Sequence, residues 1–483
     1  MRGPRAKRVL VAAMTTALLV GGAGGTLEAA PKKAASSAEK KKGNGKRRQS
    51  PQVVADQFEL QTIASDLEQP SDMDFLPDGT LLVTEKAGKL YTAGANGEKK
   101  LLLDISDHVA VQRERGLNGV AVADDFETSR RVYLLYAYRV TAGDGRQAMR
   151  LTYITLGSDD KVLNPSSPET VILGKDARPG KGCQPVSNRQ DCPSSVNATH
   201  QGGTVLAAED GTLWLGFGDS NLPSNPGAQV FRTYNPASTS GKILHIDSEG
   251  RGLPNHPFCK KDRNLDHTCT KIFARGFRNP FRFTLSPGGD PVVGDVGWNL
   301  REEIDFVRAG DNYGWPCFEG DLKTPFYREQ GRCRALYEEG KKARLAEPVY
   351  DYRNPPGGGA AGAAVIVGPH YASGAYPDDF DGSYFFGDYA KAFIKRIKIR
   401  KGKAKVTPLI TGVGPVAFTL APDGNLVFAD FVTGAIRKLV FANDNKTPVA
   451  AISASPSSGP APLDVQFSSS GTSDPEGGAL IYD

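Results

Sequence analysis

The 483-residue chain repeats one unit, in which an Asp-Gly turn is followed by a short apolar run, an acidic residue and a second apolar run. Complete copies occupy residues 78–93, 381–399 and 423–441. Asp-Gly supplies the positive φ angles of a tight hairpin turn, and apolar runs of this length are typical of strands. This pattern predicts an all-β fold built from a repeated sheet. Partial copies fall at residues 240–247 and 286–295, and further strand-type runs at 132–138 and 209–219.

The repeats lie within residues 57–441 and number about six, which predicts a six-bladed β-propeller. Each blade of a propeller buries one face against the next blade, and the ring closes because all blades share one geometry. The chain contains 55 Gly and 33 Pro, which disfavour helices and are assigned to the turns between strands. A β-sandwich with coincidental turns is the alternative.

The formal charge of +5 is concentrated at the N-terminus, where the first 50 residues hold twelve basic and two acidic residues. A basic segment and the apolar run at 9–20 are typical of a signal peptide, assigned to residues 1–30. An uncleaved anchor is the alternative. Residues 31–56 predict a basic flexible linker. We expect a secreted or periplasmic protein with no integral membrane span in the mature chain, and basic residues confined to one end predict no nucleic-acid binding.

The composition changes again at the C-terminus. Residues 447–483 are rich in Ser and Pro and contain short alternating apolar runs. They resemble the opening of a polycystic-kidney-disease-type (PKD) repeat, an immunoglobulin-like β-sandwich module. About 37 residues cannot close a sandwich that usually takes near 100 residues, so we expect an incomplete module.

Six cysteines fall in three local couples with short loops between their members. Such couples are typical of disulfides in an oxidising compartment, although six cysteines allow fifteen pairings. A zinc cluster of His256, Cys259, His267 and Cys269 is the alternative for the second couple. The three couples are Cys183 with Cys192, Cys259 with Cys269, and Cys317 with Cys333.

Two segments carry polar residues that a propeller strand does not require. His200 is followed by two glycines after Gln201, so its imidazole is open to close approach and suits a general base near neutral pH. Arg278, in the segment Gly-Phe-Arg-Asn-Pro, offers a fork of donors for carboxylate or quinone oxygens. The acids and glycines of residues 294–316 supply oxygen ligands of the type that calcium takes.

In order and spacing these motifs resemble the soluble glucose/sorbosone dehydrogenase family over nearly all of residues 57–441. The family consists of six-bladed propellers that use pyrroloquinoline quinone (PQQ) and calcium. The motifs are Glu114–Gly119, His200–Gly203 with Gly-Asp219, Phe277–Pro280, and Glu302–Asp305 with Asn312–Pro316.

The resemblance implies roles for matching positions. His200 corresponds to the base that takes the proton of a sugar's anomeric hydroxyl. Gln201, Arg278 and Asn279 correspond to residues that hold the quinone, and Arg278, a catalytic residue in this reading, stabilises with Asn279 the charge that grows on the quinone oxygens. The backbone carbonyls of Gly297 and Trp298 correspond to ligands of the calcium ion that polarises the cofactor. Glu303 and the Tyr313 carbonyl correspond to ligands of a second, structural calcium ion.

The sequence departs from the family at three places. Thr199 stands where the glucose enzymes carry an acid that orients the imidazole, and Glu114 stands where they carry an amide. We therefore hypothesise that Glu114 orients His200. The late basic residues that clamp the cofactor carboxylates have no clean match, and Lys391 and Arg396 are assigned to this role from their region. Trp298 and Trp315 either stack on a sugar or pack in the core.

The resulting functional prediction is a secreted PQQ-dependent sugar dehydrogenase that oxidises an aldose to its lactone and passes electrons to an unknown acceptor. A propeller that binds carbohydrate or protein without catalysis is one alternative. A calcium-dependent lactonase-type hydrolase is the other.

Overall fold

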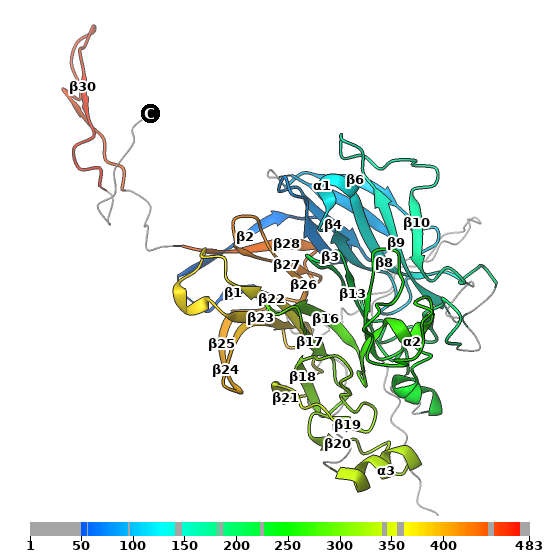
Figure 1. Cartoon of the computed structure of the whole chain (residues 1–483). Coiled ribbons are helices and arrows are strands. Elements are labelled where there is room, and N and C mark those ends of the chain that lie inside the picture. The colour runs from blue at the N-terminus through cyan, green and yellow to red at the C-terminus, as the bar shows by residue number, and fades with distance from the viewer. Residues whose placement is uncertain are drawn as a thin grey trace, which may run out of the picture.

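The computed structural model describes residues 50–473, apart from residue 56 and the segments 95–96, 141–146, 181–182, 184–186, 223–226, 341–344, 355–361 and 443–448. Within that part of the chain, six antiparallel sheets of four or five strands form a ring, which confirms the six-bladed β-propeller (Figure 1). Neighbouring blades contact one another around the ring's axis, mainly through their inner strands.

Each blade runs from an inner strand beside the ring's axis to an outer strand at the periphery. In that order, blade 1 contains β3 (Pro70–Phe75), β4 (Leu81–Glu85), β5 (Lys89–Ala93) and β6 (Lys99–Asp104). Blade 2 contains β7 (Leu117–Val122), β8 (Arg131–Tyr138), β9 (Gln147–Thr155) and β10 (Glu169–Leu173). Blade 3 contains β12 (Val205–Ala207), β13 (Leu213–Phe217), β14 (Lys242–Ile246) and β15 (Ile272–Arg275).

Blade 4 contains β16 (Pro280–Leu285), β17 (Pro291–Asp295), β18 (Arg301–Phe306) and β21 (Tyr350–Arg353). Blade 5 contains β22 (Val365–Tyr371), β23 (Ser383–Asp388), β24 (Phe393–Arg400), β25 (Lys403–Thr411) and β1 (Gln52–Val53). Blade 6 contains β26 (Pro415–Leu420), β27 (Leu426–Asp430), β28 (Ala435–Phe441) and β2 (Phe58–Ala64).

The remaining elements lie outside the blade pattern. They are β11 (Ser194–Ser195), β19 (Phe318–Glu319), β20 (Leu322–Lys323), β29 (Ser453–Ser455), β30 (Gln466–Ser468), α1 (Phe126–Ser129), α2 (Thr268–Lys271), α3 (Gly331–Glu339), and the 3₁₀ helices η1 (Ala228–Tyr234) and η4 (Asp378–Phe380). None of the helices in the described ranges is long and apolar enough to cross a membrane.

The hydrophobic core is divided into clusters that lie between adjacent blades. Between blades 1 and 2, for example, Leu82 and Leu90 share a cluster with Leu134 and Ile154. Burying both faces of every blade in this way is the largest favourable contribution to folding. The ring is closed by β2, which pairs with β28 to complete blade 6, and Figure 1 shows these two strands side by side.

The acid of the repeated sequence unit has a common structural use. It ends the second strand of a blade, and its carboxylate accepts a backbone N–H just before the inner strand of the same blade. Glu85 accepts from Glu68, and Asp388 accepts from Ala364. Asp430 does the same for Gly414. In this way the acid fixes the loop that enters the inner strand of these blades.

The three disulfides form as expected, within the local couples. Because Cys259 and Cys269 are bonded to each other, the zinc alternative is wrong. The predicted signal peptide and most of the basic linker lie outside the described residues. In the C-terminal segment the structure describes one hairpin, β29–β30, so the immunoglobulin-like module stays a prediction.

Candidate active site

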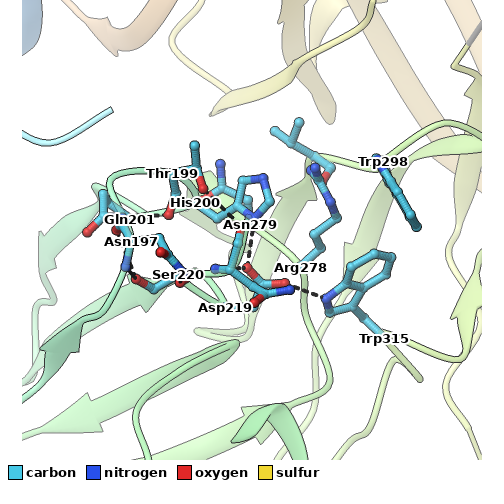
Figure 2. Close-up of polar contacts among 12 residues, drawn as sticks. Asn197, Thr199, His200, Gln201, Asp219, Ser220, Arg278, Asn279, Trp298 and Trp315 are labelled. Atoms are coloured by element: carbon cyan, nitrogen blue, oxygen red, sulfur yellow. Dashed lines mark hydrogen bonds and ion pairs between the residues drawn. The ribbon is translucent and has the colours of Figure 1, made fainter. Parts of the chain in front are cut away.

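The predicted site residues come from loops that gather at one end of the ring. His200 precedes the inner strand β12, and Arg278 and Asn279 precede the inner strand β16. Gly297 and Trp298 follow the second strand β17. Loops that precede inner strands and loops that follow second strands share one end of every blade, so the topology alone brings these segments together. Figure 2 shows His200, Arg278 and Trp298 in this cluster.

His200 forms the polar centre of the cluster with a residue that we did not predict. Its Nδ1 lies 2.7 Å from Oδ1 of Asp219, and both side chains are buried. The other carboxylate oxygen, Oδ2, accepts a 2.7 Å hydrogen bond from the indole Nε1 of Trp315 (Figure 2). A carboxylate at Nδ1 fixes the tautomer with hydrogen on Nδ1, so Nε2 keeps a free lone pair. This geometry is that of an oriented general base.

The expected orienting role of Glu114 is therefore wrong. Glu114 Oε2 instead accepts a hydrogen bond of 2.5 Å from the backbone N–H of His200, so it positions the main chain of the loop. Asp219 is the corresponding acid of blade 3, two residues beyond the end of β13. Four other blades use that acid on a backbone N–H, whereas this blade uses it on an imidazole. The Gly-Asp219 pair, which recurs in the repeats, was the sequence signal for this role.

The backbone at His200 has an uncommon conformation. Its φ of +53° lies in the left-handed region, which non-glycine residues adopt at a cost. Gly202 has φ +72°, and a Cβ on it would collide with the carbonyl of Gly216. A Cβ on Gly218 would collide with the carbonyl of His200. Close backbone packing therefore explains why the sequence needs glycine at both positions.

Asn279 and Arg278 are joined to the His200 loop through a second acid. Asp295 accepts hydrogen bonds from the backbone N–H groups of Arg278 and Asn279, at 2.9 and 2.7 Å. Asn279 Oδ1 then accepts from the N–H of Gly202 at 3.0 Å. Burial raises the pKa of Asp295 to about 7. The chain of contacts couples blade 4 to the His200 loop.

The Arg278 side chain is buried and lies over the ring of Trp315, 5.5 Å from its centroid. Its Nη1 donates to the carbonyls of Val296 and Gly297, at 2.8 and 2.7 Å. Its Nε is buried and has no partner among the described residues. An unpartnered buried donor is costly, so this nitrogen favours a ligand that accepts a hydrogen bond.

Gln201 does not present its amide to a cofactor as predicted. The side-chain nitrogen donates to the carbonyls of Asn197 and Thr199, and the side-chain oxygen accepts from Ser195 Oγ. All of these partners belong to the loop that precedes β12. The amide thus holds the shape of that loop.

The predicted carboxylate clamp is not assembled. Lys391 lies at the same end of the propeller as His200, but its Nζ donates to the Arg353 carbonyl at 2.6 Å. Arg396 pairs with Asp379, in the loop between the first and second strands of blade 5. That loop lies at the opposite end of the blade. Arg396 is therefore too far along β24 to join the site.

Buried carboxylates surround the second predicted metal position. Glu303, the predicted ligand of a structural calcium, lies in β18 with Asp305. Burial raises the pKa of both carboxyl groups well above the usual value. Repulsion from Asp305 raises the pKa of Glu303 further. Both oxygens of Asp305 are buried without a hydrogen-bond partner in the described part of the chain. Tyr313 lies beside them, since these acids raise the pKa of its hydroxyl further. The donor set is of the hard-oxygen type that calcium prefers.

The two tryptophans differ in environment. Trp315 is 4% exposed and packs against Tyr327. Trp298 is partly exposed, and its ring lies 4.4 Å from the exposed ring of Phe326. The loop of Trp298 is fixed by Glu319, whose carboxylate accepts its backbone N–H at 2.9 Å. Packing is therefore the role of Trp315, while Trp298 is only partly covered by the rings around it.

The disulfide between Cys317 and Cys333 closes the segment that packs against Trp315. Replacing both cysteines by serine is expected to lower the free energy of unfolding by about 3 kcal/mol, because a loop of this length is released in the unfolded chain. Denaturant unfolding measures the change. The matched control replaces Cys259 and Cys269 by serine, which releases a shorter loop and should cost somewhat less stability. An unchanged free energy of unfolding in the Cys317 and Cys333 variant would contradict the prediction.

A hollow of about 480 Å³ adjoins the His200 loop and is lined in part by Asn197, Asn221 and Gln229. Its size is that of a small-molecule site, and its walls offer amide groups. Fold and site together thus define a six-bladed propeller with an oriented imidazole, a buried guanidinium and an adjoining hollow of mixed polar and apolar lining.

The chain belongs to the glucose/sorbosone dehydrogenase family, which residues 67–430 match. It is 24% identical over 281 residues to quinoprotein glucose dehydrogenase B of Acinetobacter calcoaceticus, covering 55% of this chain and 54% of that protein. It is 25% identical over 260 residues to the aldose sugar dehydrogenase YliI of Escherichia coli, covering 53% and 61%. The chain thus spans about half the length of the curated relatives it matches.

Solved structures share the fold. The soluble aldose sugar dehydrogenase of Escherichia coli in its apo form superposes with a TM-score of 0.62 at 22% identity, covering 80% of this chain and 99% of that one. The PQQ-bound aldose sugar dehydrogenase of Streptomyces coelicolor superposes with a TM-score of 0.56 at 18% identity, covering 81% and 98%. At these identities the likeness supports the architecture.

Proposed function

We propose that this protein is a secreted quinone-dependent dehydrogenase that oxidises an aldose-type sugar at its anomeric carbon to the lactone. The observation that carries the proposal is the His200–Asp219 pair, set beside Arg278 at one end of the ring. Export is supported by three disulfides, which persist in oxidising compartments.

His200 is the general base of this proposal. With Asp219 on Nδ1, the free Nε2 takes the proton of the anomeric hydroxyl as the C–O double bond of the lactone forms. When bound, PQQ supplies the acceptor to which the anomeric hydride passes with its two electrons. The Arg278 guanidinium offers positive charge and a free Nε–H to ligand oxygens at the same place.

The described residues fit the quinone in part. The Nε–H of Arg278 is a buried donor without a partner among the described residues. PQQ carries carbonyl and carboxylate oxygens that could accept a hydrogen bond from it. Lys391 and Arg396, the proposed carboxylate clamp, are engaged with protein groups. Lys391 is exposed at the same end of the propeller as His200. To bind a cofactor carboxylate, its Nζ has only to leave the Arg353 carbonyl. Arg396 is not retained in the proposal.

Calcium fits one of its two proposed positions better than the other. Glu303 and Asp305 are buried acids that lack a counter-charge, which a divalent cation would supply. At the other position, the Gly297 carbonyl already accepts from the cationic Arg278. A calcium ion on that carbonyl requires the guanidinium to move aside, because the two positive charges repel.

Reconstitution tests the proposal. Purified protein with calcium and PQQ is expected to take up one quinone per chain and to reduce an artificial acceptor dye when an aldose is added. His200→Ala should lower turnover at least about 100-fold while quinone uptake is retained, because a positioned base contributes 10²–10⁴. The control is His370→Ala, at the opposite end of β22. Absence of quinone uptake would leave a binding propeller or a hydrolase instead.

A further inference from the structure

The outer hairpin of blade 5 has an unusual charge. Residues 391–405 contain eight basic residues, and no acidic residue occurs between Asp388 and Asp423. The propeller segment 57–441 as a whole contains 46 basic and 46 acidic residues, so it is neutral. The hairpin therefore concentrates positive charge on a propeller whose remaining residues are net acidic, with 38 basic and 46 acidic residues. The basic residues are Lys391, Lys395, Arg396, Lys398, Arg400, Lys401, Lys403 and Lys405.

The strand register brings like charges together. Lys398 of β24 is directly opposite Lys405 of β25, and Arg400 is opposite Lys403. Like charges at directly opposed positions destabilise a sheet. Burial lowers the pKa of Lys395, and the positive charge of Lys391 lowers it further. Lys398 is partly compensated, because its Nζ donates to the Asp379 carbonyl at 3.3 Å. A bound polyanion would reduce the remaining repulsion between the opposed pairs.

The charged tip of the hairpin is open to a large partner. β23 pairs with β24 only as far as Lys398, so the last residues of β24 and the turn extend beyond the blade. β1 covers β25 only near Thr411. Arg400, Lys401, Lys403 and Lys405 are exposed. Figure 1 shows β24 and β25 at the periphery of the ring.

We propose that this basic hairpin docks the protein on an acidic polysaccharide, a polymer of sugars that carry carboxylate groups. Lysine ammonium groups are flexible point charges that suit spaced carboxylates. Single-stranded nucleic acid would favour aromatic rings for base stacking, but Phe393 is the only aromatic residue from 391 to 411, and Lys395 covers its ring at 4.0 Å.

The location of the hairpin tip adds a functional consequence. β24 starts at the end of the blade that carries Lys391 and the site loops, and it ends at Arg400 on the opposite side. A polymer bound at the tip leaves the His200 end of the ring free. The hairpin thus anchors the propeller with its site facing away from the polymer.

The test uses polygalacturonate as the probe and measures binding to the full chain at about 50 mM salt, where exposed charges are weakly screened. The test variant carries Lys398→Gln, Arg400→Gln, Lys403→Gln and Lys405→Gln. The control carries Lys100→Gln, Lys260→Gln, Lys261→Gln and Arg263→Gln, which remove the same charge from positions elsewhere on the propeller. We expect affinity to fall at least about tenfold in the test variant, and to change little in the control.

Each other outcome overturns the proposal. Equal losses in both variants would indicate net charge alone. Loss only when the basic residues of 31–48 are neutralised would assign binding to the linker. Tighter binding to duplex DNA than to polygalacturonate would identify the wrong polymer, and aggregation of the test variant with unchanged affinity would show that the lysines only protect an edge strand. Circular dichroism and sugar oxidation by the test variant separate these results from misfolding and from the proposed activity.

Discussion

Asp219→Asn is expected to reduce turnover by on the order of 10²- to 10⁴-fold, with quinone uptake retained. Three donors converge on this carboxylate: His200 Nδ1, the Asn221 N–H and Trp315 Nε1. An amide offers one acceptor oxygen and one donor nitrogen, so it cannot satisfy all three. Its NH₂ group must face either the imidazole or the indole. Facing the imidazole, it favours the tautomer in which Nε2 carries the hydrogen and cannot act as a base.

The tautomer itself is the decisive measurement, because a general loss of structure would not change it selectively. Nitrogen-15 NMR of the His200 ring should report hydrogen on Nδ1 in the parent and a shift toward Nε2 in the variant. The matched control is Glu114→Gln. Its amide oxygen can still accept from the His200 backbone N–H, so turnover should change only a few-fold. Turnover lost in Glu114→Gln but kept in Asp219→Asn would reverse our assignment of the orienting residue.

Arg282→Met is expected to lower the free energy of unfolding by about 3–5 kcal/mol, the loss typical of breaking a buried ion pair. Arg282 lies on the inner strand of blade 4 and reaches across the ring's axis. Its Nε donates to Val416 of blade 6, and Nη2 donates to Ser71 of blade 1 and Asn118 of blade 2. One fully buried guanidinium thus joins four blades.

The pH dependence of this variant follows from Asp72, 3.8 Å from Nη2. Burial raises the pKa of Asp72 even with Arg282 present, and loss of the cation should raise it further. A carboxyl with a raised pKa in the folded state destabilises that state as pH rises above the unfolded value near 3.8. The deficit of Arg282→Met should therefore be smaller at about pH 5 than at about pH 8.

Denaturant unfolding at both pH values measures these differences. Arg282→Lys is the charge-preserving control and should recover only part of the stability, because an ammonium cannot span the same carbonyls. Adding Asp72→Asn to Arg282→Met should restore stability at high pH. A deficit that is independent of pH, or no deficit at all, would show that Arg282 does not neutralise Asp72.

Local sequence patterns predicted the repeated strands, the turns and the disulfides, because each depends on residues close together in the chain. The acid of each repeat was visible, but its partner was not. Asp219 meets an imidazole from a loop some 19 residues earlier, and Trp315 comes from the next blade. The local sequence around Arg282 carries no signal of its role, since only closure of the ring brings the carbonyls of distant blades to it.

The basic hairpin of blade 5 was also visible in the sequence, but we assigned the positive charge to the N-terminus alone. Residues 391–405 are as basic as that terminus. Counting charge over long stretches of the chain averaged this hairpin with acidic neighbours. Arg396 was predicted to face a cofactor because its region matched. The direction of β24 instead places Arg396 beside Asp379, toward the end of the blade opposite His200.

Closure by β2 has a consequence for how the protein is made. Arg437 of β28 donates a hydrogen bond to Thr62 of β2, although the two residues lie 375 positions apart in the chain. The last blade therefore cannot be completed until nearly the whole propeller has been synthesised. Contacts of such sequence separation slow folding. Until then β2 is a strand with an unpaired edge, which is prone to join other chains. A chain that ends before β28 would keep its first blades but remain open, and aggregation rather than partial activity is the expected fate of such truncated products.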